Sequence, residues 1–261
     1  MTDKILVDVA EATATITFNN PERRNAVSLE MWEAVEAALV RMEDDDALRV
    51  VIITGAGDKA FVSGADISKF ESERAEAEAV ATYNAATARV YDRLYTFPKP
   101  VIAKIKGVCV GGGLNLAVAC DLRICNECAR FAMPAAKLGL GYGYGSLKRL
   151  AHVVGLPNAL ELAYTAKLFP GEDAFHMGAV NRVIADDELD AFVEDYAVRI
   201  ANNAPLTIRT FKAGAVELRK HESERDMARL DALVAQCFES DDYVEGRRAF
   251  MEKRKPAFKG C

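Results

Sequence analysis

The sequence predicts a mixed α/β fold followed by a helical C-terminal region. Up to about residue 185, short apolar runs rich in β-branched residues alternate with helical patterns. From residue 186 onward every segment has helical spacing, and no strand-like run interrupts it. Hydrophobic residues make up 51% of the 261 residues, enough to bury a sizeable core.

The N-terminal segment is expected to form a hairpin. Residues 5–9 and 13–18 have the composition of strands, and in the second the threonines alternate with Ala14, Ile16 and Phe18. A period of two predicts a half-buried strand. Ser28 is then the expected N-cap of a helix that runs to about residue 44, with apolar residues at helical spacing.

The alternation of strands and helices continues through the middle of the chain. Residues 49–54 predict a strand, an acidic stretch over 71–78 leads into a helix that ends near residue 95, and the next strand starts at Pro100. Helices are then expected over 186–202, 205–219, 222–238 and 241–255. Because no flexible linker separates them from the rest, the sequence predicts a core of residues 1–185 and a helical region of residues 186–261, packed on that core or on another subunit.

Composition and charge exclude several classes of partner. The net charge is −6, which is unfavourable for a nucleic-acid-binding protein. The basic cluster of Arg247, Arg248 and residues 253–255 is either a solvated helix face or a phosphate contact. No stretch approaches the ~20 apolar residues that span a bilayer, and the N-terminus has no signal-peptide pattern. The sequence therefore predicts a cytoplasmic protein with no membrane or nucleic-acid partner.

Cysteine and histidine usage argues against a metal centre. Most of the six cysteines lie in apolar segments, as reduced thiols do. Cys125 and Cys128 form a single CxxC pair with no second pair beside it, which is a weak zinc signal. His152 and His176 fall within apolar helical patterns, which predicts core or interface positions. We expect no metal.

A run of three glycines is the most informative motif. Gly111, Gly112 and Gly113 follow an apolar strand-like run and precede an apolar helical pattern. Glycine lets a ligand approach the main chain closely, and the free amides of a first helical turn carry partial positive charge. Such amides stabilise an oxyanion or enolate by on the order of 3 kcal/mol per donor. The alternative is an ordinary tight turn.

Several segments together resemble the crotonase (enoyl-CoA hydratase/isomerase) superfamily. The resemblance extends over nearly the whole chain, in residues 19–26, 61–67, 100–121, 137–150 and 252–259. It implies the ClpP/crotonase fold of repeated ββα units. It also implies that the backbone N–H groups of Ala65 and Gly112 form a two-amide oxyanion hole.

The resemblance implies coenzyme A as part of the substrate, with no permanently bound cofactor. Its contact positions correspond to Arg24, Ala26, Ser63, Gly64, Asp66, Ile67, Gly111 and Ala135, with Phe258 and Lys259 from the end of the chain. Two of these have structural alternatives: Arg24 as an exposed turn residue, and Asp66 as an acceptor that fixes its loop. The resemblance also implies a homotrimer or a dimer of trimers.

The chain departs from the hydratase pattern at both catalytic positions. That pattern has two glutamates, at the positions that Asn115 and Ala135 occupy here. Neither an amide nor a methyl group titrates near neutral pH. One acid/base group contributes roughly 10²–10⁴-fold, so ordinary hydration and double-bond isomerisation are both disfavoured. Tyr142 and Tyr144, set among glycines, are candidates to donate hydrogen bonds or transfer a proton, or else are packing residues.

Three functions remain open. The first is an acyl-CoA enzyme that stabilises an enolate or oxyanion without the glutamate pair, as in decarboxylation, C–C cleavage or hydrolysis, with Asn115 orienting a water or the acyl group. The second is a catalytically silent acyl-CoA binding protein. The third is an enoyl-CoA hydratase whose acid/base groups come from elsewhere.

Overall fold

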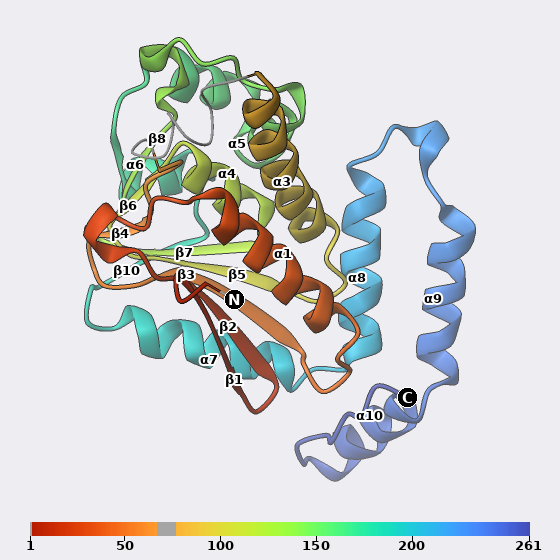
Figure 1. Ribbon diagram of the computed structural model, residues 1–261. Helices are drawn as coiled ribbons and strands as arrows, with labels where there is room; N and C mark the ends of the chain where they lie inside the picture. The colour runs from red at the N-terminus through yellow and green to blue at the C-terminus, as the bar shows by residue number, and fades with distance from the viewer. Residues whose placement is uncertain (1, 67–76) are drawn as a thin grey trace.

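The computed structural model describes residues 2–66 and 77–261. Ile67, a predicted acyl-CoA contact, lies outside these residues. The strands of the structure form two sheets, and helices pack on the sheets (Figure 1). The strands are β1 (Ile5–Ala10), β2 (Thr13–Phe18), β3 (Val50–Gly55), β4 (Ala60–Val62), β5 (Val101–Ile105), β6 (Val108–Val110), β7 (Leu122–Asn126), β8 (Arg130–Ala132), β9 (Phe169–Pro170) and β10 (Arg182–Ile184).

The helices follow the predicted order along the chain. They are η1 (Pro21–Arg23), α1 (Leu29–Glu43), α3 (Ala77–Thr96), α4 (Gly112–Ala119), η3 (Pro134–Leu138), α5 (Tyr144–Thr165), α6 (Gly171–His176), α7 (Leu189–Ala201), α8 (Pro205–Leu218), η4 (Glu222–Glu224), α9 (Met227–Glu239) and α10 (Asp241–Glu252).

The six-stranded sheet has the order β1-β2-β3-β5-β7-β10. Only its β1–β2 pair is antiparallel, and this pair is the predicted hairpin. Ala14, Ile16 and Phe18 are buried, as their alternation predicts. β3 is buried along its whole length because helices cover both faces of the sheet. α1 and α3 pack on one face and α7 on the other.

A second sheet brings together the chain segments that form the candidate site. Its order is β4-β6-β8-β9, and β4, β6 and β8 are parallel. Each of these three short strands follows a long strand of the first sheet and precedes a helix, which gives ββα units β3-β4-α3, β5-β6-α4 and β7-β8-α5. The loops after β4 and β6 are therefore neighbours at one edge of this sheet.

Ser28 occupies the N-cap of α1 as expected, but its side chain makes no cap hydrogen bond, and its buried hydroxyl has no partner among residues 2–66 and 77–261. The core alternative for His152 and His176 was wrong, because both side chains are exposed in the single chain. His152 shares a 2.8 Å hydrogen bond with the Tyr95 hydroxyl. A helical pattern of apolar residues shows only roughly which face of the helix a neighbouring polar residue occupies. This explains why the pattern did not show that the two histidines are exposed.

The C-terminal helices continue away from the sheets. α7 lies across the first sheet, and α8 stands beside the end of α3 (Figure 1). α9 packs on α8 on its outer side, and α10 lies beyond it near the C-terminus (Figure 1). Within the described ranges, none of the helices combines the length and the apolar character that crossing a membrane requires.

Candidate functional site

The loops that follow β4 and β6 bring two glycines into contact. A Cβ added to Gly64 would lie 3.7 Å from the Gly112 nitrogen, and one added to Gly112 would lie 3.6 Å from the Gly64 Cα. Gly64 has φ +110° and Gly111 has φ +57°, both in the region that favours glycine. The two segments that sequence analysis selected are therefore adjacent.

The Ala65 amide is oriented by an isolated parallel bridge to Val27. Val27 N donates to the Gly64 carbonyl at 2.9 Å, and Asp66 N donates to the Val27 carbonyl at 3.0 Å. Successive N–H groups of an extended segment point to opposite sides, so the Ala65 N–H points away from Val27. It donates to no acceptor in the part of the chain that the structure describes.

Gly112 is the first residue of α4, where a helix leaves its amides unpaired. Gly111, by contrast, donates its N–H to the Ala132 carbonyl at 3.0 Å. The positive end of the α4 dipole therefore adjoins Gly64. Two free amides, from Ala65 and Gly112, belong to adjoining segments, which is the donor set an oxyanion hole requires.

Two tyrosines of α3, which the sequence analysis missed, support these two segments. The Tyr83 hydroxyl donates to the Val27 carbonyl at 2.9 Å, and the Tyr91 hydroxyl donates to the Gly112 carbonyl at 2.8 Å. Both rings are buried, and burial raises the pKa of Tyr91 well above its usual value. Their spacing of eight residues, about two helical turns, is the signal that could have placed them on one face.

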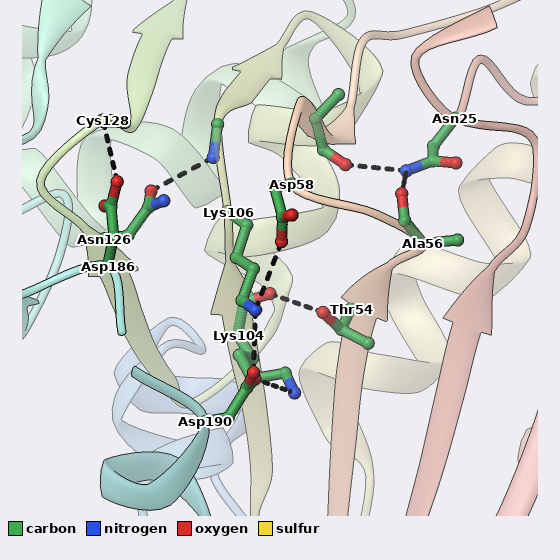
Figure 2. Close-up of polar contacts among 12 residues, drawn as sticks. Asn25, Thr54, Ala56, Asp58, Lys104, Lys106, Asn126, Cys128, Asp186 and Asp190 are labelled. Carbon is green, nitrogen blue, oxygen red and sulfur yellow. Dashed lines mark hydrogen bonds and ion pairs between the residues drawn. The ribbon is translucent and has the colours of Figure 1, made fainter. Parts of the chain in front are cut away.

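The loop from Arg24 to Ala26 lies against the Ser63 segment, because Ser63 N donates to the Arg24 carbonyl at 3.1 Å. Asn25 is fully buried at φ +55°. Its amide nitrogen donates to the Ala56 and Ala60 carbonyls at 3.0 and 2.7 Å (Figure 2). The Arg24 side chain is exposed next to the candidate site, and Ala26 is buried.

Asp66 is 5% exposed and forms an ion pair with Arg23 at 3.4 Å. The Asp66 backbone N–H also holds Val27, so the residue ties η1 to the loop after β4. This arrangement agrees with the structural alternative for Asp66.

Asn115 and Tyr142 form a pair one helical turn beyond Gly112. The Tyr142 hydroxyl donates to Asn115 Oδ1 at 2.6 Å. Burial raises the pKa of Tyr142 to about 12, so the phenol stays protonated at neutral pH. Tyr144 is 79% exposed at the start of α5, and its hydroxyl makes no hydrogen bond to any residue that the structure describes. Ala135 follows Pro134, whose Cδ lies 3.9 Å from a Cβ added to Gly111.

Phe258 and Lys259 lie among the C-terminal helices: Phe258 lines a cavity formed by α8, α9 and α10, and the Lys259 N–H donates to Asp242 of α10. Lys259 lines a cavity of about 1030 Å³ together with Lys212, and Lys212 Nζ binds Asp121, just beyond the C-terminal end of α4. Gly112 starts the same helix, so the two regions lie at its opposite ends. Within the basic cluster, Arg254 pairs with Glu245 and Glu252.

A second polar group lies at the carboxyl ends of β5 and β7, in the first sheet. Lys104 and Lys106 both bind Asp190 of α7, at 2.6 and 2.7 Å, and the Cys128 thiol donates to the Asp186 carboxylate at 3.0 Å (Figure 2). These contacts join α7 and its preceding loop to β5 and β7. These ion pairs and hydrogen bonds join the side chains of the group to one another, so their role is structural.

Comparison with known proteins agrees with this architecture. A family model described as enoyl-CoA hydratase/isomerase matches residues 8–261. A crotonyl-CoA hydratase from Syntrophomonas wolfei is 35% identical over 256 residues, 98% of this chain and 98% of that protein.

Solved structures give the same result. The crystal structure of an enoyl-CoA hydratase/carnithine racemase from Magnetospirillum magneticum has a TM-score of 0.95 and 38% identity, covering 100% of this chain and 97% of the other. An enoyl-CoA hydratase from Bacillus anthracis has a TM-score of 0.90 and 31% identity, covering 99% and 100%. The chain therefore has the crotonase fold and belongs to the enoyl-CoA hydratase/isomerase family.

Proposed function

We propose that this protein is an acyl-CoA enzyme that holds the thioester oxygen between the amides of Ala65 and Gly112. The observation that carries the proposal is the adjacency of these two segments, each with an amide that lacks an acceptor in the described ranges. Both donors belong to rigid backbone, so they are oriented before a substrate binds. Family membership supports acyl-CoA as the substrate class.

The reaction we propose is not ordinary two-glutamate hydration. Asn115 and Ala135 stand where the hydratase pattern needs an acid and a base, and neither titrates near pH 7. A reaction that generates an enolate or oxyanion without a strong protein base fits this site better: decarboxylation, C–C cleavage or thioester hydrolysis. In each, the two amides stabilise the negative oxygen as it forms.

The substitution of Gly112 tests the oxyanion hole. Gly112→Pro removes one donor at the first helical position, where proline is tolerated best. Turnover of a panel of malonyl-, crotonyl-, dienoyl- and aryl-acyl-CoA esters, followed by mass spectrometry, is expected to fall by roughly 10²–10³-fold. Gly112→Ala adds a Cβ but keeps the N–H and serves as the control. Equal activity of the proline variant and wild type would reject the mechanism.

A second candidate function is acyl-CoA binding without turnover, which the two non-titrating positions favour. Turnover of the ester panel by the wild-type protein distinguishes the candidates, because a silent protein would bind the esters without forming product. A double variant, Asn115→Glu with Ala135→Glu, tests whether the missing glutamates explain a lack of hydration. We expect crotonyl-CoA hydration to rise by at least 10²-fold over wild type, since each acid/base group contributes about that much. Rapid hydration by the wild-type protein would instead favour a hydratase with acid/base groups from elsewhere.

We also propose that the protein acts as a homotrimer or a dimer of trimers. Lys259 lies near the opposite end of α4 from Gly112, and Phe258 lies among α8, α9 and α10, so the tail of one subunit is better placed to reach the substrate of another. Large apolar side chains exposed on α8, α9 and α10 support such an assembly: Phe211, Leu218, Phe238, Phe250 and Met251.

A further inference from the structure

We infer that the acyl group bound by this protein carries a carboxylate, which accepts a hydrogen bond from Asn115. Tyr142 orients the Asn115 amide, and the buried Arg149 supplies positive charge nearby. The inference rests on the proposed function, since it assumes that the thioester lies at Gly112. It goes further by naming the class of acyl chain. Three observations carry it: a free amide donor, a buried cation, and the uncharged side chains of Asn115 and Ala135.

The first observation is the orientation of Asn115. Asn115 is 7% exposed, and its Oδ1 accepts the Tyr142 hydroxyl at 2.6 Å. With its oxygen occupied by a phenol that stays protonated, Asn115 presents only Nδ2, a donor that bonds to no residue within 2–66 and 77–261. A donor selects for an oxygen acceptor on the ligand.

The position of Asn115 suits an acyl substituent close to the thioester. Asn115 lies three residues after Gly112 on the same helix, which is an axial rise of about 4.5 Å. A chain whose thioester oxygen binds the Gly112 amide would place its second or third carbon near Asn115. A carboxylate on a malonyl or succinyl chain falls in this range.

The second observation is a buried arginine behind the pair. Arg149 is 7% exposed, and its Nε has no acceptor in the described part of the chain. Its guanidinium lies 5.4 Å from the centroid of the Tyr91 ring, the same tyrosine that binds the Gly112 carbonyl. Burial has the largest effect on the pKa of Tyr142 and raises it, while the Arg149 charge opposes this shift.

The charge of Arg149 is only partly offset. Its acidic partner is Asp92, at 2.7 Å, and the Asp92 side chain is 68% exposed, so solvent screens that carboxylate more than it screens the buried cation. The less screened of the two charges is therefore that of the Arg149 guanidinium. An anion that accepts a hydrogen bond from Asn115 would be stabilised by both this charge and the amide donor.

The third observation is that the side chains of Asn115 and Ala135 are uncharged. A carboxylate at either position would repel a carboxylated acyl group, because juxtaposed like charges disfavour binding. The uncharged side chains avoid this repulsion.

Isothermal titration calorimetry with two matched ligands tests the inference. Succinyl-CoA carries the carboxylate, and 4-methylpentanoyl-CoA has a chain of the same shape without charge. For the wild-type protein we expect succinyl-CoA to bind at least tenfold more tightly. Asn115→Asp, which is isosteric and adds a negative charge, is expected to lower this ratio at least tenfold. Lys148→Gln, which removes an exposed cation next to Arg149, is expected to keep it.

The ratio of the two dissociation constants is insensitive to a folding defect in a variant, because unfolded protein lowers the number of binding sites for both ligands equally. Equal binding of the two ligands to wild type would overturn the inference and leave the proposed function intact. An unchanged ratio in Asn115→Asp would also overturn it. If neither thioester bound, the proposed function would fail as well.

Discussion

Asn115 offers a different chemistry from the glutamate that the hydratase pattern has at this position. Its amide donates hydrogen bonds and takes no proton near neutral pH. The Tyr142 hydroxyl fixes which end of the amide is free. In the proposed function, this side chain serves binding instead of proton transfer.

The pKa of Tyr142 predicts a loss of stability at high pH. The phenol ionises near pH 10 in the unfolded chain, and burial raises its pKa in the folded protein to about 12. Between these values the folded protein keeps a proton that the unfolded chain has released, so rising pH favours unfolding. We expect wild type to lose about 2 kcal/mol more than Tyr142→Phe between pH 9 and pH 12.

Urea unfolding at several pH values measures this difference. Tyr144→Phe, which alters an exposed tyrosine two residues away, is the control and should follow wild type. Identical pH curves for wild type and Tyr142→Phe would show that the phenol is not buried as described.

Elements with a clear period could be predicted from the sequence, and shorter ones could not. The alternation in residues 13–18 and the helical spacing after residue 28 gave β2 and α1 nearly to the residue. β4, β6 and β8 have three residues each, too few to display a period. Their parallel pairing, which makes the two site loops neighbours, depends on contacts across the chain.

The candidate site was only partly predictable for the same reason. Gly112 and Ala65 could be proposed as donors, and their segments expected together, because glycine runs and the family motif are local signals. Tyr83 and Tyr91 could not, because a tyrosine on an amphipathic helix usually packs in the core. Their roles depend on which backbone carbonyl lies opposite each hydroxyl, and this requires the tertiary fold.

The anchoring of α8 to α4 depends on a buried ion pair. Lys212 is 6% exposed and binds Asp121, whose carboxylate also accepts the Val101 N–H at 2.8 Å. Burial lowers the pKa of Lys212 and Asp121 opposes this shift. Lys212→Met leaves the Asp121 charge without its cation, which is expected to cost about 3 kcal/mol of unfolding free energy.

Chemical denaturation followed by circular dichroism measures the effect. The double variant with Asp121→Asn should recover part of the loss, because it removes the unpaired charge as well. Arg199→Met, which removes an exposed pair on α7, should cost less than about 1 kcal/mol. A similar small cost for Lys212→Met would mean that the pair does not anchor α8.

At the scale of the whole molecule, the candidate site and the tail occupy opposite ends of α4. The ββα units fix the first end through β4 and β6. The second end adjoins α8 through Lys212 and Asp121, and α8, α9 and α10 line an open apolar cavity of about 830 Å³. A single subunit leaves the large apolar side chains that line this cavity in contact with water, so an assembly would bury them.

Phe250 tests whether this face forms the subunit interface. Its side chain is 81% exposed on α10, and it lines the apolar cavity with Phe211 and Phe238. Phe250→Asp introduces a charge that would be desolvated in an interface but not in a monomer, so it should shift a trimer of 28.5 kDa chains toward single chains. Light scattering coupled to size-exclusion chromatography at micromolar concentration measures the mass. Tyr164→Asp places the same charge at a side chain 76% exposed on α5, outside this face, and should leave the mass unchanged. If Phe250→Asp kept the mass of a trimeric wild type, the interface would lie on other elements.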